Sequence, residues 1–351
     1  DLSYDQRMQR ICTSLVDGGY DVLLVGFVKK KSIPLDEKPF DQHRVRLFFK
    51  RGKLFYVEYN FRLFFLLLFA RFDIVCGIDI DTLLPCYLTS KAKNKTCVYD
   101  AHEYFSELPE VIEKPLVSKI WKWLEKFLVR RVKPSYTVCE SIAKRLESEY
   151  RTHFKVIRNV PHLRNLKTVE KSESYILYQG ALNEGRGLEQ LILAMNKIDC
   201  QLWIAGEGDL SQELREFAKQ NDRNDRVKFL GYLPPDELRD ITREATVGVN
   251  LLENKGLSYY YSLSNKFFDY IHAGIPQVTM NFPEYAALNE QFGVAVLVDD
   301  LGKNALVNAI ESLLNDERKY HLLAENCKKA RLELNWENEE KQLLEFYNNM
   351  Q

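Results

Sequence analysis

The residues best suited to chemistry in this sequence lie in loops that follow short apolar segments. The loop 180–187 holds three glycines and places Arg186 directly before an expected helix. Backbone N–H groups at a helix N-terminus attract anions, and a nearby guanidinium strengthens that attraction. The loop therefore predicts a diphosphate site. A surface turn with a solvated arginine is the alternative that these residues leave open.

Two further loops hold the same position after an expected strand. Residues 206–209 read Gly-Glu-Gly-Asp, and Gly231 is followed by Tyr232. A lone Gly-x-Gly most often only turns the chain, whereas a glycine beside an aromatic side chain leaves room for a nucleobase against the main chain. The second loop therefore favours base recognition.

The segment 264–276 carries the most informative polar pattern. Lys266 and Asp269 are three residues apart in an expected helix, so they share a face near its N-terminus. In isolation this spacing indicates an ion pair on a solvated helix. Only its context, described below, favours a binding role.

Candidate polar residues of the first half follow two expected strands. His102 lies after one of them, where a histidine caps a helix as often as it catalyses. Asp79 and Asp81 follow the other, and they either orient an acceptor hydroxyl or cap a helix expected from Thr82. We attribute their Asp-x-Asp spelling to chance, so no metal site is expected.

Apolar strands and amphipathic helices alternate in two series that must position these loops. The first series includes strands expected at 20–26, 44–49, 54–58 and 72–78, and the second begins at 175–178. Such alternation predicts α/β domains with parallel sheets, which bind ligands beyond the carboxyl ends of their strands. We expect two Rossmann-like, doubly wound domains that face each other across a cleft.

Chain length and a proline at position 161 set the expected domain boundaries. A chain of 351 residues exceeds one ordinary core, and the polar segment 162–173 is typical of a linker. We expect an acceptor-side domain at 1–162, whose first strand is missing because the sequence opens with a helix. A donor domain is expected at 163–335, followed by a helix, 336–351, that packs back on the first domain.

Composition excludes several classes of protein. The 49 basic and 50 acidic residues give a net charge of -1, which argues against nucleic-acid binding. The seven cysteines form no C-x-x-C pair, so buried thiols in a reducing cytoplasm are expected rather than disulfides or zinc. The apolar run 63–70 is far shorter than the roughly 20 residues of a membrane span.

Six short motifs follow one another along almost the whole chain. They occupy residues 100–103, 156–161, 178–187, 204–208, 229–232 and 265–276. Each is weak alone, but their order and spacing are specific. Together they resemble the retaining glycosyltransferases of the GT-B fold, in particular family 4, which includes bacterial polysaccharide and lipid-linked sugar transferases.

This resemblance implies a site for a nucleoside diphosphate sugar in the second domain. Asp269 matches the family's acid that holds the ribose hydroxyls, and Arg186 matches its basic residue. The resemblance assigns donor binding to Gly180, Gly185, Glu207, Gly231, Tyr232, Glu253, Asn265 and Asp269.

Two positions depart from the family's pattern. Tyr261 stands where the family has a second acid, and Ala181 replaces an arginine. We expect Glu253 to substitute for the acid and Lys266 to restore the missing charge.

The resemblance also implies the catalytic groups. His102, Arg186 and Lys266 are expected to be catalytic, because negative charge develops on the departing diphosphate and cations stabilise it. Asp79, Asp81 and Glu103 are expected on the acceptor side. Members of the family retain the anomeric configuration, with the leaving phosphate helping to deprotonate the acceptor, so neither a nucleophile nor a metal cofactor is required.

The expected reaction is transfer of a sugar from a UDP- or GDP-type donor to a hydroxyl of a glycan, lipid-linked or small-molecule acceptor. A sugar-nucleotide epimerase or hydrolase of the same fold is one alternative. A non-catalytic nucleotide-sugar-binding module is another, and the departures at Tyr261 and Ala181 favour it.

A basic segment of the first half bears on the acceptor. Its lysines and arginines accompany Trp121, Trp123 and Phe127 around an expected helix, 120–132. Such a helix either lies on an anionic membrane or packs its apolar side on the sheet with solvated charges. The first alternative predicts a cytoplasmic protein attached to the inner face of the plasma membrane.

Overall fold

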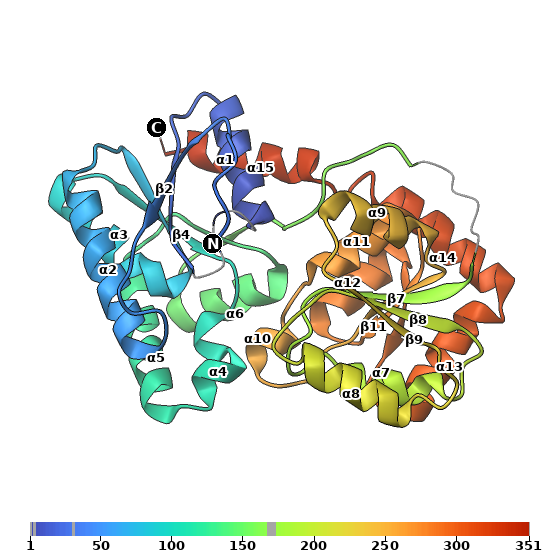
Figure 1. Ribbon diagram of the computed structural model, residues 1–351. Coiled ribbons are helices and arrows are strands. Elements are labelled where there is room, and N and C mark those ends of the chain that lie inside the picture. Colours follow the sequence, from blue (N-terminus) through green and yellow to red (C-terminus); the bar gives the residue numbers. More distant parts are fainter. Residues whose placement is uncertain (1, 3–4, 30–31, 167–172, 351) are drawn as a thin grey trace. The chain divides into compact units, whose positions relative to one another are not determined.

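The computed structural model describes residues 2, 5–29, 32–166 and 173–350. The chain divides into two compact units (Figure 1). Unit 1 comprises Asp1–Asn159 and Asn338–Gln351, and unit 2 comprises Val160–Glu337. The boundaries expected from the sequence stay predictions, and part of the expected linker, 167–172, lies outside the described residues.

Unit 1 contains a parallel sheet of order β3-β4-β5-β6 and a parallel pair, β1-β2. Its strands are β1 (Leu23–Phe27), β2 (Asp41–Val45), β3 (Ile74–Ile78), β4 (Thr96–Ala101), β5 (Ser135–Thr137) and β6 (Lys155–Val156). Its helices are α1 (Gln6–Asp17), α2 (Gly52–Phe69), α3 (Asp79–Lys93), η1 (Phe105–Glu107), α4 (Pro109–Ile112), α5 (Pro115–Val129) and α6 (Glu140–Tyr150).

The expected strand 54–58 is wrong, because these residues lie in α2. Their β-branched and aromatic side chains favour a strand locally. The buried positions Tyr59, Leu63 and Leu67 are four residues apart, however, which is the spacing of a helix stripe. Burial of that stripe outweighs the local preference of the residues before it.

The helix expected from Thr82 also begins earlier than predicted. α3 starts at Asp79, so Asp79 and Asp81 lie inside its first turn and do not cap a helix that starts at Thr82. Asp79 has a φ of 54°, a left-handed conformation that aspartate tolerates better than most residues. The chain thus turns sharply at the carboxyl end of β3.

Unit 2 is a doubly wound domain with a six-stranded parallel sheet of order β12-β11-β10-β7-β8-β9. Its strands are β7 (Tyr175–Gln179), β8 (Gln201–Ala205), β9 (Val227–Gly231), β10 (Val247–Asn250), β11 (Gln277–Met280) and β12 (Ala295–Val298). Its helices are α7 (Leu188–Met195), α8 (Ser211–Asn221), α9 (Pro235–Glu244), α10 (Leu257–Tyr260), α11 (Asn265–Ala273), α12 (Pro283–Phe292), α13 (Lys303–Leu314) and α14 (Glu317–Ala330).

The order of the strands reverses between β7 and β10 in unit 2. The chain runs from β7 to β8 on one side, and β10 pairs with β7 on the other. Ligands of open parallel sheets bind at such a switch point, beyond the carboxyl ends of the strands. The loops after β7 and β10 therefore form the expected place for a ligand.

Helix α15 (Trp336–Asn348) passes from one unit to the other along the chain. Trp336 N donates to Pro161 O within unit 2 at 2.9 Å. Within unit 1, the ring of Phe346 lies 5.2 Å from that of Tyr136, and Tyr20 Oη donates to Asn348 Oδ1 at 2.9 Å. The end of the chain thereby completes the core of unit 1.

Candidate functional site

Three glycine loops of unit 2 are tied to one another at the carboxyl ends of β7, β8 and β9. Gly180 N donates to Ala205 O at 2.9 Å, and Gly206 N donates to Gly231 O at 2.7 Å. A Cβ on Gly206 would lie 2.0 Å from Gly180 O, so no larger residue fits there unless the loops move apart. The close approach of these loops requires glycine.

Lys266 of α11 points at the first of these loops. Its side chain is 9% exposed, and its Nζ lies 4.6 Å from the centre of the Tyr178 ring. A Cβ on Gly180 would lie 3.6 Å from the same Nζ. Burial lowers the pKa of Lys266 to about 7, and the charge of Arg186 acts in the same direction. A bound anion would restore the full charge of Lys266.

Arg186 lies in the same loop, two residues before α7 begins. Its guanidinium lies 5.3 Å from the centre of the Tyr259 ring. Its Nε is buried and has no hydrogen-bond partner among the residues that the structure describes. Arg186 lies close enough for its charge to act on Lys266, and the two form a cationic site that fits a diphosphate.

Asp269 is held by two residues that the sequence analysis missed. Gln179 Nε2 donates to Asp269 Oδ2 at 2.9 Å. The Thr242 hydroxyl shares its one proton between Gln179 Oε1 at 2.7 Å and Leu238 O at 2.6 Å. Gln179 and Thr242 are only 4% and 3% exposed. These contacts orient the Asp269 carboxylate at the carboxyl end of β7.

Gln179 could have been recognised as a candidate site residue, because its polar amide ends a strand that is otherwise apolar or aromatic. The partner Thr242 lies 63 positions away on α9, and local patterns do not reveal such a contact.

The remaining donor-side residues fall into two groups. Glu207 lies next to Gly231, whose Cβ would be 3.3 Å from Glu207 Oε1, and Tyr232 is 63% exposed. Glu207 accepts from Arg215 at 2.5 Å, and this bond lowers the pKa of Glu207. Asn265 is exposed at the start of α11.

Glu253 belongs to a separate ionic group. It pairs with Lys255 at 2.8 Å, and Lys255 also pairs with Glu184 at 2.7 Å. Tyr261 ends α10, and Ala181 is exposed after β7. The substitution of Glu253 for the acid absent at Tyr261 therefore stays a prediction.

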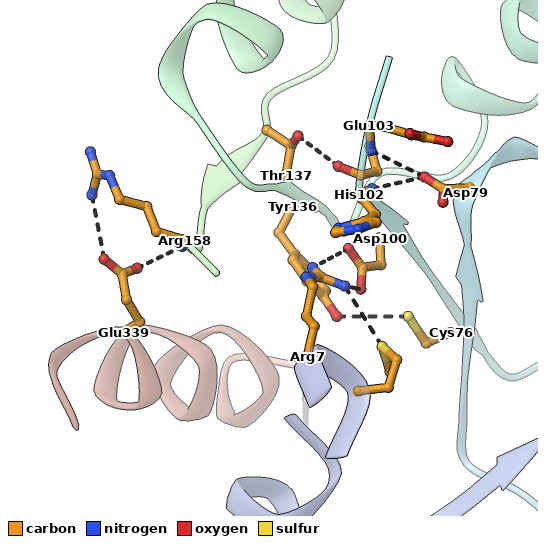
Figure 2. Close-up of polar contacts among 12 residues, drawn as sticks. Arg7, Cys76, Asp79, Asp100, His102, Glu103, Tyr136, Thr137, Arg158 and Glu339 are labelled. Carbon is orange, nitrogen blue, oxygen red and sulfur yellow. Dashed lines mark hydrogen bonds and ion pairs between the residues drawn. The ribbon is translucent and has the colours of Figure 1, made fainter. Parts of the chain in front are cut away.

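His102 lies beside a buried ion pair of unit 1 (Figure 2). Arg7 of α1 donates from both terminal nitrogens to Asp100, each at 2.6 Å, and both side chains are buried. Such bidentate geometry fixes the end of β4 against α1. Local sequence patterns do not reveal the role of Arg7, because its partner Asp100 lies 93 positions away.

His102 is exposed as a residue, while Asp100 and Arg7 lie close to it in unit 1 (Figure 2). Desolvation by the surrounding protein, with the nearby charge of Arg7, lowers the pKa of His102 to about 4. His102 is therefore neutral near pH 7, and a neutral imidazole can accept a proton or a hydrogen bond.

Asp79 holds the loop that carries His102. Its Oδ1 accepts from the backbone N–H groups of His102 at 2.9 Å and of Glu103 at 3.3 Å (Figure 2). Burial and the neighbouring acids Glu103 and Asp81 raise the pKa of Asp79, and burial raises that of Asp81 to about 7. The structure brings His102 together with Asp79, Asp81 and Glu103, the three residues that the sequence predicts on the acceptor side.

The described part of the chain contains neither a metal-ligand cluster nor a membrane-spanning helix. Across residues 2, 5–29, 32–166 and 173–350, no group of three or more His, Cys, Asp or Glu side chains could hold a metal ion. Within the same ranges, no helix has both the length and the hydropathy needed to cross a bilayer.

Comparison with protein families gives two matches that together span most of the chain. A model described as Glycosyltransferase Family 4 matches residues 6–163, and one described as Glycosyl transferases group 1 matches residues 161–330. An uncharacterized glycosyltransferase of Methanocaldococcus jannaschii is 26% identical over 184 residues. That match covers 51% of this chain and spans about half, 46%, of the relative's length.

Solved structures show the same fold at low identity. Sucrose-phosphate synthase from Thermosynechococcus elongatus has a TM-score of 0.82 and 17% identity, over 98% of this chain and 92% of that one. Anabaena HepE in complex with UDP-glucose has a TM-score of 0.75 and 14% identity, over 97% and 96%. WaaG, a glycosyltransferase of lipopolysaccharide biosynthesis, has a TM-score of 0.74 and 14% identity, over 97% and 94%.

Proposed function

Because the chain belongs to the family 4-like glycosyltransferases of the GT-B fold, we propose that it transfers a sugar from a nucleoside diphosphate sugar to an acceptor hydroxyl. One observation carries this proposal. At the switch point of unit 2, the buried Lys266 and the nearby Arg186 meet a loop of glycines. This arrangement suits a diphosphate better than any other common metabolite group.

The donor lies across the loops after β7, β8 and β9. Asp269, whose carboxylate is oriented by Gln179, receives the ribose hydroxyls. Gly231 and Tyr232 receive the base, with Glu207 beside them. Anabaena HepE, which has this fold, was solved with UDP-glucose, and this supports a UDP-type donor, with GDP as the other candidate.

Cleavage of the bond between sugar and phosphate leaves negative charge on the diphosphate. Lys266 and Arg186 stabilise that charge, and their burial makes the stabilisation stronger than it would be in water. The leaving phosphate takes the proton of the acceptor hydroxyl on the same face of the sugar. This route retains the anomeric configuration and needs no protein nucleophile and no metal ion.

The acceptor hydroxyl is held by unit 1. Neutral His102 accepts its hydrogen bond, and Asp79, Asp81 and Glu103 surround the acceptor sugar. Asp79 acts indirectly, because its carboxylate is engaged with the loop that carries His102. The acceptor is a glycan, a lipid-linked sugar or a small molecule with a free hydroxyl.

Helix α5 supports a lipid-linked acceptor at an anionic membrane. Leu116, Ile120 and Trp123 are 71%, 56% and 64% exposed along one stripe. Lys119, Lys122 and Lys126 are also exposed beside this stripe, while Glu125, Leu128 and Val129 face the core. The outward side therefore carries both apolar groups and positive charge, as a helix at a membrane surface does.

Thermal unfolding with UDP, GDP, CDP and ADP tests the donor site. A ligand at about 100 times its dissociation constant adds about 2.7 kcal/mol to the free energy of unfolding. We expect one diphosphate to raise the unfolding temperature and Asp269→Ala to abolish the rise. Absence of any rise would contradict the proposed site.

Product analysis separates transfer from the other reactions of this fold. We expect the labelled sugar to appear on an added acceptor. Release of the free sugar or of an epimerised nucleotide sugar without acceptor would identify a hydrolase or an epimerase. Nucleotide binding without any product would identify a binding module.

A further inference from the structure

Large apolar side chains are exposed on unit 1 along the loop after β2 and along α2. We call this surface the α2 face. It consists of Phe48, Phe49, Leu54, Val57, Phe61, Phe65 and Phe69, and each is between 41% and 83% exposed. Contiguous apolar patches of this kind on a folded protein mark a binding surface more often than a chance cluster.

A groove on this face combines apolar walls with cations. It has a volume of about 590 Å³ and lies between β2 and α2. Its apolar lining includes Phe61 and Phe65, and its charged lining comprises Arg44, Arg46 and Arg62. The groove therefore suits a ligand that joins an acyl chain to a phosphate.

The segment around the groove is strongly basic. Residues 41–69 hold six lysines or arginines against two acids, Asp41 and Glu58. Glu58 is engaged within the segment, since it accepts from the backbone of Phe48 at 2.9 Å and from Arg62 Nε at 2.7 Å. The α2 face therefore presents a net positive charge around its apolar centre.

We propose that the α2 face docks on a bilayer of anionic phospholipids, with a headgroup phosphate in the groove. Aromatic side chains that enter the interface and arginines that pair with phosphates are the two contributions that hold a protein on such a surface.

Charge argues against a second copy of this chain as the occupant. A two-fold interface sets the same surface of each copy against itself. The six basic residues of one copy would then face the six of the other, and this repulsion opposes association. An anionic bilayer removes that repulsion and covers the same apolar area.

Vesicle sedimentation of the full chain tests the proposal. We expect binding to vesicles of phosphatidylcholine mixed with phosphatidylglycerol, weak binding to phosphatidylcholine alone, and loss of binding at high salt. Arg46→Gln should weaken partitioning about fivefold, because one basic residue near the surface contributes about 1 kcal/mol. Adding Phe61→Ser and Phe65→Ser should weaken it roughly tenfold further.

A matched variant on unit 2 is the control, with Lys329→Gln, Leu322→Ser and Leu332→Ser. It removes one exposed charge and two exposed apolar groups, and it should leave vesicle binding unchanged. If an α5 variant with Lys119→Gln, Ile120→Ser and Trp123→Ser loses vesicle binding and the α2 variant does not, the α2 face is not the docking site. If soluble glycerol phosphate abolishes vesicle binding while Phe61→Ser and Phe65→Ser leave it unchanged, the groove binds a free phosphate and the docking proposal is wrong.

Three further measurements complete the test. Light scattering reports the oligomeric state, and a dimer that the α2 variant dissociates without change in vesicle binding would overturn the proposal. Hydrogen exchange across β3 and β4 checks that unit 1 of each variant is folded, and the nucleotide-induced thermal shift reports the donor site. Because that shift belongs to unit 2, failure of the donor site and failure of membrane docking give different results.

Discussion

Burial sets the charge that Lys266 carries. With a pKa of about 7, this lysine is about half protonated near neutral pH, whereas a solvated lysine is fully protonated. A bound diphosphate favours the protonated form and raises the pKa again. Donor binding is therefore coupled to uptake of a proton by this side chain.

Donor affinity should consequently fall as pH rises above about 7, the pKa of Lys266 without ligand. The protonated lysine binds the diphosphate, and above this pH binding must also take up a proton. Titration calorimetry across pH with the nucleotide sugar measures the effect, because the phosphates of such a donor do not titrate in this range. Lys266→Met should bind more weakly at low pH and lose most of the pH dependence. An unchanged profile would show that Lys266 does not contact the donor.

The hydrogen bonds to Asp269 predict a second effect. Thr242→Val removes the donor to Gln179 and frees its amide to rotate, so the Asp269 carboxylate loses its fixed orientation. We expect the donor dissociation constant to rise roughly fivefold to tenfold, which corresponds to about 1 to 1.4 kcal/mol for one buried hydrogen bond. The matched control is Thr246→Val, whose hydroxyl contacts Ser174 instead. Equal effects of both variants would contradict an orienting role.

Sequence patterns identified Asp269, Lys266 and Arg186 because each lies within a short motif. They missed Gln179, Thr242 and Arg7 as functional supports. Each of these acts through a partner 63 to 93 positions away or on another element, and no local spacing encodes such a contact.

The glycine loops show how whole elements constrain the site. Gly206→Ala would place a Cβ 2.0 Å from Gly180 O, and the residue has a φ of 142°. The variant should lower the free energy of unfolding of unit 2 by roughly 3 kcal/mol and weaken donor binding, since the loops must separate.

Gly19→Ala is the matched control for this variant. Gly19 also has a positive φ, of 89°, but nothing lies within 4 Å of its Cβ position. Gly19→Ala should lower the free energy of unfolding by only about 1 kcal/mol, through backbone strain alone. Chemical denaturation compares the two, and equal losses would mean that close approach of the loops is unimportant.

Periodicity predicted most elements, and its errors have physical causes. The parallel sheets and most helices follow from alternation of apolar strands and amphipathic helices. The start of α2 was misread because residues 54–58 have side chains that favour strands, whereas the buried stripe of the helix lies further along. The start of α3 was misread because Asp79 enters the helix from a left-handed turn.

At the scale of the whole molecule, the last residues belong to the first unit. Leu343 and Tyr347 of α15 are 0% and 4% exposed. Removal of residues 338–351 should destabilise unit 1 and expose Tyr136, while unit 2 keeps its donor site.

Hydrogen exchange with and without nucleotide measures this outcome. Protection should fall across β4 and β5, and nucleotide should still protect the loops after β7 and β8. Loss of nucleotide protection in the shortened chain would show that the donor site depends on α15.

This division of the chain also affects the order of folding during synthesis. Domains usually form as they leave the ribosome, starting with the N-terminal one. Here residues 160–337 emerge complete before residues 338–351 exist, so unit 2 can form its core while unit 1 still lacks its final helix. The part of the protein translated first therefore reaches its final structure last.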